Sequence, residues 1–231
     1  MTVLVMVRVL DVTGAGELDL EAGSCSQPPT FPRYLMREQD IRDALRTQLK
    51  RRFSDEPNSL LVEELGLCQG SARVDVAVVN GRLNGYEIKS KYDTLQRLPS
   101  QEDYFSRVFD TVTIVTAQSH LEAARESVPD WWGIEAVDLN DGEAEWQVER
   151  APSPNPSVDS YSLVQLLWKD EALAALEERG LDQGLRTKPR RELWKALVKH
   201  LSVVQINSLV RRTLKEREGW LSGPRLQLGD E

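Results

Sequence analysis

Apolar and polar residues alternate over two short stretches in the first half of the chain, residues 73–79 and 86–89. Alternation with a period of two is typical of β-strands, because successive side chains point to opposite faces of a sheet. Asn-Gly pairs at 80–81 and 84–85 lie between the two stretches. Asn-Gly is a strong signal for a tight turn, since both residues tolerate positive φ. The pattern therefore predicts a β-hairpin.

Helices and strands are predicted to alternate through the rest of this half of the chain. Residues 38–53 have the period of an amphipathic helix. Residues 112–116, 119–127 and 133–137 follow one another as strand, helix and strand with short connections, which predicts a right-handed parallel crossover. The other predicted elements are a first strand over 59–64, a helix over 100–109 with Ser100 as its N-cap, and an edge strand over 146–148.

Two groups of side chains in these elements have predicted positions. The adjacent Trp131 and Trp132 are predicted to lie in the core or to cover the sheet edge, rather than to form a platform on which bases stack. In the helix over 38–53, the predicted buried stripe is Ile41, Leu45 and Leu49, and the predicted exposed stripe is Arg42, Arg46 and Lys50.

A proline-rich segment separates two parts of the chain. Residues 151–157, APSPNPS, cannot continue a helix or a strand and are predicted to form a linker. Leucine-rich stripes beyond it predict helices over 161–179, 190–201 and 203–217. The predicted organisation is a leader over 1–33 that is poorly ordered or a short strand, a domain over 34–150, a linker over 151–160 and a helical region over 161–231.

Basic residues gather in the helical region. The net charge of −8 argues against a general nucleic-acid coat, but the charge is unevenly distributed. Residues 1–150 carry 16 Lys and Arg against 26 Asp and Glu, whereas residues 186–217 hold ten basic side chains and two acidic ones. This segment predicts either a phosphate-binding surface or a solvated helix face. The residues predicted to contact nucleic acid are Arg186, Lys188, Arg190, Arg191 and Lys195.

Several function classes have little support in the sequence. Cys25 and Cys68 lack the spacing of a disulfide framework or a zinc site, and we expect buried thiols. His120 and His200 have no spaced partners for a Ser-His-Asp centre or a histidine-rich metal site. The apolar start of the chain is interrupted by charged residues and is too short to span a bilayer. We expect a cytoplasmic protein of bacterial type that does not bind membranes.

Three ionisable residues of the predicted hairpin form a candidate site. Asp75 lies on the first strand, and Glu87 and Lys89 lie on the second, two residues apart and hence on one face. Two carboxylates and a lysine on one face suit metal-dependent hydrolysis of phosphodiester bonds. The carboxylates can hold Mg²⁺, or Mn²⁺ as a substitute, and the ammonium can orient the attacking water or stabilise developing charge.

The register of the hairpin decides whether the two acids meet. A regular two-residue turn would place them on opposite faces of the sheet, which would argue against a shared metal site. One extra residue, from a three-residue turn or from a bulge with Gly81 or Gly85 in the left-handed region, brings Asp75 opposite Glu87. We therefore predict such a bulge.

The spacing of these residues resembles the motif of the PD-(D/E)xK nuclease superfamily. Asp75 is followed 12 positions later by Glu87-Ile88-Lys89, and Val74 stands where the motif usually has proline. The stretches DxAVVxGxxxGYEIKS, DTLQRL, QxxY and PDWWGI extend the resemblance over most of the chain, to a bacterial branch with a RecB-like or Holliday-resolvase-like core. The resemblance implies an α/β fold, with a restriction-endonuclease-like mixed central sheet flanked by helices and a C-terminal helical appendage.

The resemblance also implies roles for particular residues. Asp75 and Glu87 would be metal ligands, with the backbone carbonyl of Ile88 as a further metal oxygen, and Lys89 would be catalytic. Gln101 would support the site from the following helix, as in the Gln-x-x-Tyr motif of RecB-like nucleases, with Tyr104 beside it. Two supporting acids have open alternatives. Glu38 also suits a first-turn residue that complements the helix dipole, and Glu64 is preferred only weakly over Glu63.

The helical region resembles a further DNA-binding motif. The stretch LAALEERGLDQGLRTKPRRELWKAL is similar to the SAP-type helix-extended-helix, although a helical bundle packed on the sheet is an equal alternative. The function implied by these resemblances is a metal-dependent DNA endonuclease. The alternative is a catalytically inactive module of the same fold that binds DNA or a protein partner. Many nucleases of this fold cut both strands as symmetric pairs, so a homodimer is also consistent with the resemblance.

Overall fold

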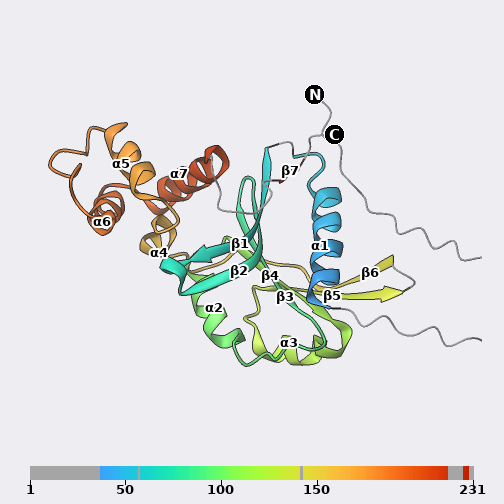
Figure 1. Cartoon of the computed structure of the whole chain (residues 1–231). Coiled ribbons are helices and arrows are strands. Elements are labelled where there is room, and N and C mark those ends of the chain that lie inside the picture. The colour runs from blue at the N-terminus through green and yellow to red at the C-terminus, as the bar shows by residue number, and fades with distance from the viewer. Residues whose placement is uncertain (1–36, 57, 141–142, 218–225, 229–231) are drawn as a thin grey trace, which may run out of the picture. The chain divides into compact units, whose positions relative to one another are not determined.

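A seven-stranded mixed sheet forms the centre of the computed structural model, which describes residues 37–56, 58–140, 143–217 and 226–228 (Figure 1). The strand order is β6-β5-β4-β3-β2-β1-β7. Helices flank this sheet and follow it in the chain, as the predicted α/β class requires. The strands are β1 (Ser59–Leu67), β2 (Ala72–Val79), β3 (Leu83–Lys89), β4 (Thr111–Ala117), β5 (Gly133–Asn140), β6 (Glu143–Arg150) and β7 (Leu226–Leu228).

The centre of the sheet is parallel and its margins are antiparallel. β3 pairs with β4 and β4 pairs with β5 in parallel, through connections that contain α2 (Leu98–Ser106) and α3 (Leu121–Ser127). The predicted parallel pairing of the strands on either side of the helix over 119–127 is confirmed. β1, β2 and β3 pair antiparallel, and so do β5 and β6. β6 lies at the sheet edge, as predicted for residues 146–148.

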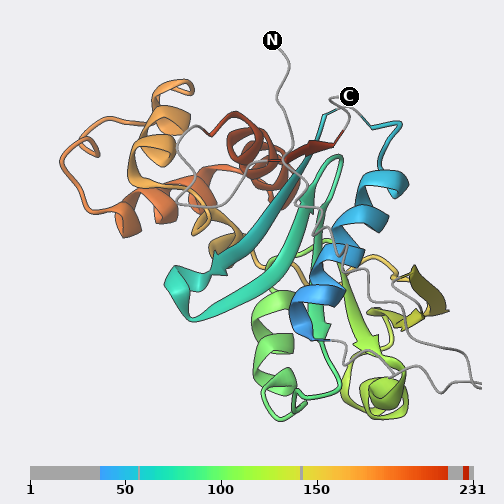
Figure 2. The same ribbon diagram turned by 45° about the vertical axis from the view of Figure 1, so that its right-hand side comes forward.

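Helix α1 (Glu38–Arg52) covers one face of the sheet (Figure 2). The predicted apolar stripe of Ile41, Leu45 and Leu49 is fully buried against the sheet. The predicted exposure of Arg42 is wrong, because this side chain is buried and reaches into the polar end of the sheet. A basic residue next to an apolar stripe is buried when carboxylates of another element lie within its reach.

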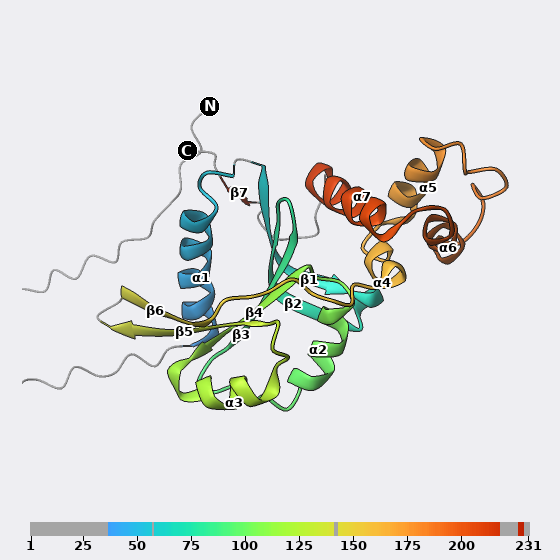
Figure 3. The ribbon, with the colours of Figure 1, turned by 180° about the vertical axis from the view of Figure 1, so that it is seen from behind.

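Helices α2 and α3 and the C-terminal helices cover the opposite face (Figure 3). α2 begins at Leu98, with Arg97 as its N-cap residue, so the prediction that Ser100 caps this helix is wrong. Pro99 lies in the first turn of α2, where the missing amide hydrogen costs nothing and the fixed φ suits a helix. The hydroxyl of Ser100 donates instead to the carbonyl of Arg97.

The predicted helix over 161–179 is two helices, α4 (Ser160–Val164) and α5 (Lys169–Glu177). The chain restarts a helix at Trp168 because its backbone N–H donates to the carboxylate of Glu171 in a capping box. The two later predicted helices are present as α6 (Arg190–His200) and α7 (Val203–Glu216), with bounds within one residue of the prediction. None of the helices in the described ranges has the length and apolarity that a bilayer crossing needs.

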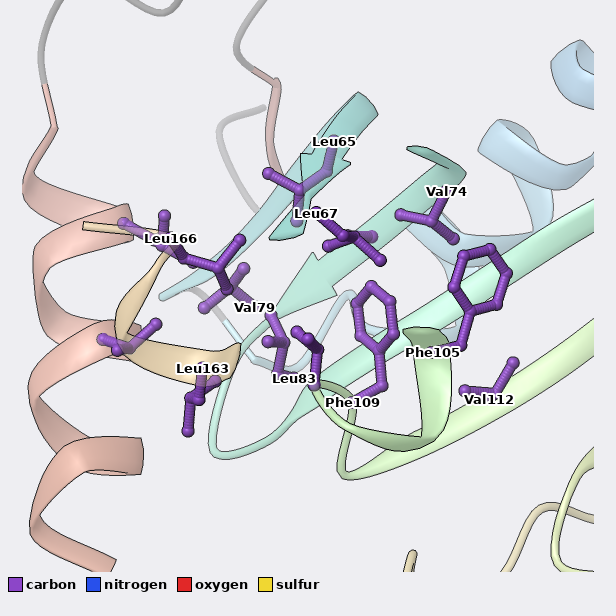
Figure 4. Close-up of a cluster of buried hydrophobic side chains, with 14 of the residues drawn as sticks. Leu65, Leu67, Val74, Val79, Leu83, Phe105, Phe109, Val112, Leu163 and Leu166 are labelled. Atoms are coloured by element: carbon purple, nitrogen blue, oxygen red, sulfur yellow. The ribbon is translucent and has the colours of Figure 1, made fainter. Parts of the chain in front are cut away.

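The C-terminal helices share a hydrophobic core with the sheet. Figure 4 shows Leu163 and Leu166 next to Val79 and Leu83 of the central strands. The proline-rich segment before them is hydrogen-bonded to the sheet domain, because the side-chain amide of Asn155 donates to the backbone carbonyls of Ser106 and Phe109 at the end of α2. The described residues all belong to one compact unit over 33–231, and the predicted leader over 1–33 lies outside the described residues.

The tryptophan pair lies where the sequence predicted it. Trp132 is fully buried and stacks on Phe105 of α2, with ring centroids 5.9 Å apart, and is therefore part of the core. Trp131 is partly buried and contacts Trp132 edge-on. Cys68 is partly buried at the end of β1 and is a free thiol, whereas Cys25 lies outside the described residues.

Candidate functional site

The turn of the β2–β3 hairpin contains three residues. Val79 lies opposite Leu83, so Asn80, Gly81 and Arg82 form the turn. The N–H of Asn80 donates to the carbonyl of Arg82 at 3.0 Å, and the side-chain oxygen of Asn80 accepts from the N–H of Arg82 at 2.8 Å. The predicted extra residue is confirmed, and it comes from the turn. This register directs Asp75 towards Glu87.

The alternative of a left-handed glycine bulge is wrong. Neither Gly81 nor Gly85 has positive φ. The second Asn-Gly pair lies inside β3 and not in the turn, because β3 begins at Leu83. Gly85 serves a close approach instead, since a Cβ atom there would lie 2.9 Å from the ring of Phe109.

Strands β2 and β3 separate at Asp75, the first residue of the candidate site. The paired residues end at Val76 and Tyr86. Beyond this point the backbone N–H of Ile88 donates to Oδ2 of Asp75 at 2.8 Å. The carboxylate thus takes the place of a strand partner, which fixes its position in the gap between the two strands. Oδ1 of Asp75 accepts from Nη2 of Arg42 at 2.9 Å.

The neighbouring strand changes face at Glu64. Before this residue, Leu60 and Val62 pack in the core cluster on the α2 side of the sheet. After it, Leu65 and Leu67 pack in the same cluster, although strict alternation would place them on the other face. Glu64 has a φ of 56°, a conformation that is rare without glycine and that is often found near functional sites. Its backbone conformation therefore interrupts the alternation next to Asp75.

Glu87, Lys89 and Gln101 form a tight polar group on the α2 side of the sheet. Oε1 of Glu87 accepts hydrogen bonds from Nζ of Lys89 and from Nε2 of Gln101, both at 2.6 Å. Nζ of Lys89 also donates to Oε1 of Gln101 at 3.2 Å. Only 2% of Glu87 and 4% of Lys89 are exposed. The predicted support of the site by Gln101 is therefore direct contact with both charged residues. We call Asp75, Glu87, Lys89 and Gln101 the Glu87 cluster.

The second carboxylate oxygen of Glu87 is buried without a hydrogen-bond partner among the described residues. We call this atom, Oε2, the open oxygen. Burial first, and the nearby charge of Asp75 second, raise the pKa of Glu87 to about 7, despite the opposite effect of Lys89. A buried carboxylate oxygen is costly to leave unpaired. This position therefore favours a proton or a cation as its partner.

The Glu87 cluster opens into a cavity of about 490 Å³. The cavity has the polar lining expected of a site for a charged ligand, and Ser71, Arg73, Asp93 and Arg97 contribute to it. Glu64 is not part of the lining but pairs with Arg42 and Arg73. Glu63 pairs with Arg46 of α1. The predicted site residues that line the cavity are Glu38, Asp75, Glu87, Ile88, Lys89, Gln101 and Tyr104.

Arg42 belongs to this site although the sequence placed it on an exposed stripe. Its guanidinium donates to the backbone carbonyl and to Oδ1 of Asp75, and it pairs with Glu38 and Glu64. Burial lowers the pKa of Arg42, but its hydrogen bond to Glu38 and the charges of Asp75 and Glu64 outweigh that effect and raise the pKa. The only indication in the sequence was the spacing of Glu38 and Arg42, which lie one helical turn apart and can form an ion pair.

The predicted nucleic-acid residues lie on the C-terminal helices and on the loop before α6. All five are exposed and none lines the cavity. Arg186 pairs with Glu177 and Asp182, and Lys195 pairs with Glu192. The guanidinium of Arg190 lies over the ring of Trp194. The structure therefore does not bring these side chains into the catalytic candidate site.

The carboxylates that line the cavity suit a single Mg²⁺ ion better than a metal site built from protein ligands alone. Within the part of the chain that the structure describes, no three His, Cys, Asp or Glu side chains are arranged so that they could hold a metal ion together. Mg²⁺, however, is usually held by one or two carboxylates and completes its shell with water and substrate phosphate oxygens. Asp75 and Glu87 line the cavity, and their oxygens could serve as two such ligands. The role of the Ile88 carbonyl stays a prediction.

Comparison with known proteins places the chain in one family. Residues 32–221 match the family model of bacteriophage P4 protein cII. Protein cII of Enterobacteria phage P4 is 26% identical over 185 residues, which cover 79% of this chain and 68% of that protein. Among solved structures, a protein of unknown function from Silicibacter pomeroyi is 17% identical, covers 68% of this chain and 99% of its own, and has a TM-score of 0.40.

Proposed function

The chain belongs to the bacteriophage P4 protein cII family, and we propose that it is a metal-dependent DNA endonuclease that hydrolyses phosphodiester bonds. The observation that carries this proposal is the open oxygen of Glu87. It belongs to a carboxylate that lines a polar cavity together with Asp75, and the ammonium of Lys89 is bound to the other oxygen of that carboxylate. A purely structural ion pair of this depth is expected to satisfy both carboxylate oxygens.

In the proposed mechanism, Gln101 positions Glu87, and Glu87 and Asp75 bind the metal ion. Gln101 fixes the rotamer of Glu87 through its 2.6 Å hydrogen bond to Oε1, and Oε2 has no hydrogen-bond partner among the described residues. Asp75 is fixed by Arg42 and by the N–H of Ile88. When bound between these carboxylates, Mg²⁺ or Mn²⁺ would polarise the scissile phosphate and acidify a water molecule.

Lys89 is proposed to act on the reacting groups directly. Lys89 lines the cavity, and its Nζ donates hydrogen bonds to Oε1 of Glu87 and to Oε1 of Gln101, which fix its position. An ammonium at this point can hydrogen-bond the attacking water or a phosphate oxygen on which negative charge develops. Tyr104 lines the same cavity one helical turn after Gln101 and would limit where the substrate can lie.

Cleavage assays with matched variants test the proposal. Purified protein is incubated with supercoiled, linear, single-stranded and branched DNA in the presence of Mg²⁺, Mn²⁺ or a chelator. We expect cleavage with either metal ion and none with the chelator. Substitution Lys89→Met should lower the rate by a factor on the order of 100 to 1,000, the usual effect of removing one group that stabilises transition-state charge. The exposed Lys91 provides the control, Lys91→Met.

The outcomes separate catalysis from mere binding. Full activity of Lys89→Met would reject the assignment of the site. An equal loss of activity in Lys91→Met would show that the effect is not specific to Lys89, and would also contradict the assignment. Circular dichroism and thermal unfolding of both variants establish that they are folded. Absence of cleavage of every substrate with either metal ion would reject the nuclease proposal.

A second candidate function is a module of the same fold that binds DNA or a protein and does not cleave. The hydrogen bonds that already occupy Lys89 and both oxygens of Asp75 favour it, because they hold the site together without a metal ion. In that case the basic side chains of α6 would carry the binding. Substitution of Arg190 and Arg191 by Glu should then abolish DNA binding, and the chelator should have no effect on it.

A further inference from the structure

Arg42 gathers three carboxylates from three different elements. Its Nη2 donates to Oε1 of Glu38 on the same helix at 2.6 Å and to Oδ1 of Asp75 on β2 at 2.9 Å. Its Nη1 lies 3.0 Å from Oε1 of Glu64 on β1 and donates to the backbone carbonyl of Asp75 at 3.0 Å. Only 8% of the Arg42 side chain is exposed. A single guanidinium thus neutralises part of a dense acidic group at the wall of the cavity.

Nuclease centres with two metal ions need carboxylates for both ions. The two ions lie about 3.5–4 Å apart and share ligands between them. Here Glu38, Glu64 and Asp75 already surround the guanidinium of Arg42. A second divalent ion among these three acids would lie against the fixed positive charge of Arg42, which repels it. The open oxygen of Glu87, by contrast, has no hydrogen-bond partner among the described residues.

We propose that Arg42 takes the place of a second divalent cation, so that the centre binds a single ion between Asp75 and Glu87. This inference rests on the proposed function and specifies the metal content of the same site. Arg42 is then a positioning residue, which keeps Asp75 in place and compensates the acids that the single ion does not reach. The inference also explains why Arg42 is buried, whereas Lys50 and Arg51 of the same helix are exposed.

Metal stoichiometry is the direct test. Binding of Mn²⁺ to the full chain is counted by electron paramagnetic resonance and by calorimetric titration, without any substrate. We expect one ion per chain for the unmodified protein and for Arg42→Lys, which keeps the charge. We expect Arg42→Gln to bind a second ion, because three carboxylates are released there. Arg46→Gln is the control, since Arg46 lies one turn along α1 and pairs with Glu63 and Asp43.

Thermal unfolding gives a second readout for the same variants. Removal of Arg42 leaves three acids in close proximity, so Arg42→Gln should melt at a lower temperature than the unmodified chain, and Mn²⁺ should raise its melting temperature more than it raises that of the unmodified chain. Arg46→Gln should respond to Mn²⁺ like the unmodified chain. If Arg42→Gln does not fold even with Mn²⁺, the stoichiometry of the unmodified chain and of Arg42→Lys decides.

The outcomes distinguish this inference from the function on which it rests. Two ions in the unmodified chain or in Arg42→Lys would overturn the role of Arg42 and leave the nuclease proposal intact. One ion in Arg42→Gln, with no greater thermal response to Mn²⁺, would overturn it as well. No ion in the unmodified chain would contradict the metal site itself, and with it both proposals.

Discussion

Adjacent residues of β3 enter two buried ionic clusters on opposite faces of the sheet. Tyr86 faces α1 and lies with Arg52 and Glu135 in what we call the Glu135 cluster, whereas Glu87 faces α2. Both clusters contain a carboxylate that is 2% exposed. In the Glu135 cluster, Nη1 and Nη2 of Arg52 donate to the two oxygens of Glu135 at 2.9 and 3.0 Å. That pair is bidentate and complete.

The two clusters differ in the hydrogen bonding of the second carboxylate oxygen and in whether the carboxylate lines the cavity. The Glu135 cluster uses both carboxylate oxygens and does not line the 490 Å³ cavity, while the Glu87 cluster lines that cavity and leaves the open oxygen without a hydrogen-bond partner among the described residues. Burial raises the pKa of Tyr86 to about 12, so its hydroxyl stays neutral, whereas the pKa of Glu87 is raised to about 7, within the working range of enzymes. Burial of a charged side chain therefore does not by itself indicate a functional site. A buried carboxylate that lines a cavity and has one oxygen without a hydrogen-bond partner is the stronger indication.

The largest expected effect is the loss of the arginine from the Glu135 cluster. Substitution Arg52→Ala leaves the carboxylate of Glu135 buried without a counter-charge. We expect the free energy of unfolding, measured by urea denaturation, to fall by about 3–5 kcal/mol. The affinity for Mn²⁺ should not change, because this cluster lies on the other face. A weakened affinity for Mn²⁺ would contradict the separation of the two clusters.

Neutralising the Glu87 cluster should have the opposite effect on stability. The double substitution Glu87→Gln and Lys89→Met replaces a buried ion pair by neutral groups of similar size. Such replacements often stabilise a protein by about 1–4 kcal/mol. We expect a higher free energy of unfolding near pH 8 together with the loss of Mn²⁺ binding. A strongly destabilised double variant would indicate that the pair is there for stability and not for function.

Gln101 should affect the metal without being a ligand. Substitution Gln101→Ala removes a 2.6 Å hydrogen bond to Glu87 and frees its rotamer. Loss of such an outer partner typically costs 10- to 100-fold in metal affinity. Calorimetric titration with Mn²⁺ measures the effect, with the exposed Gln118→Ala as the control. Equal affinities of the two variants would show that Gln101 only fills space.

The pH dependence of metal binding should show the raised pKa of Glu87. A metal ion needs the ionised carboxylate, and below about pH 7 a proton competes for the open oxygen. We expect the Mn²⁺ affinity to be constant above that value and to fall about tenfold for each pH unit below it. An affinity that stays constant down to the ordinary pKa of 4.5 would show that Glu87 is not the ligand.

The local parts of this structure could be predicted from the sequence. The apolar stripe of α1, the central strands and the extra residue in the hairpin all depend on neighbouring residues, and all three were predicted. The pairing of Gln101 with Glu87 and Lys89 followed from a motif resemblance and the spacing along the chain. The sequence misled at two helix starts. α2 begins at Leu98 with Pro99 in its first turn, and α5 begins after Trp168, whose backbone N–H donates to Glu171.

The missed part of the site depends on contacts that are distant in the chain. The burial of Arg42 follows from the position of Asp75, 33 residues later, and the helical spacing of Glu38 and Arg42 indicates only their pairing and not this burial. Glu64 changes the face of β1 next to the same aspartate, because its positive φ interrupts the alternation of faces along the strand. Both exceptions gather around Asp75. Places where local patterns fail are expected near functional sites.

Diffraction from crystals soaked in Mn²⁺ tests the central claim most directly. The anomalous signal of Mn²⁺ locates the ion without any assumption about activity. We predict one peak per chain, within coordination distance of Asp75 and of the open oxygen of Glu87. No peak in the cavity, or a peak held only by residues outside the Glu87 cluster, would contradict the claim that this cluster is a metal centre.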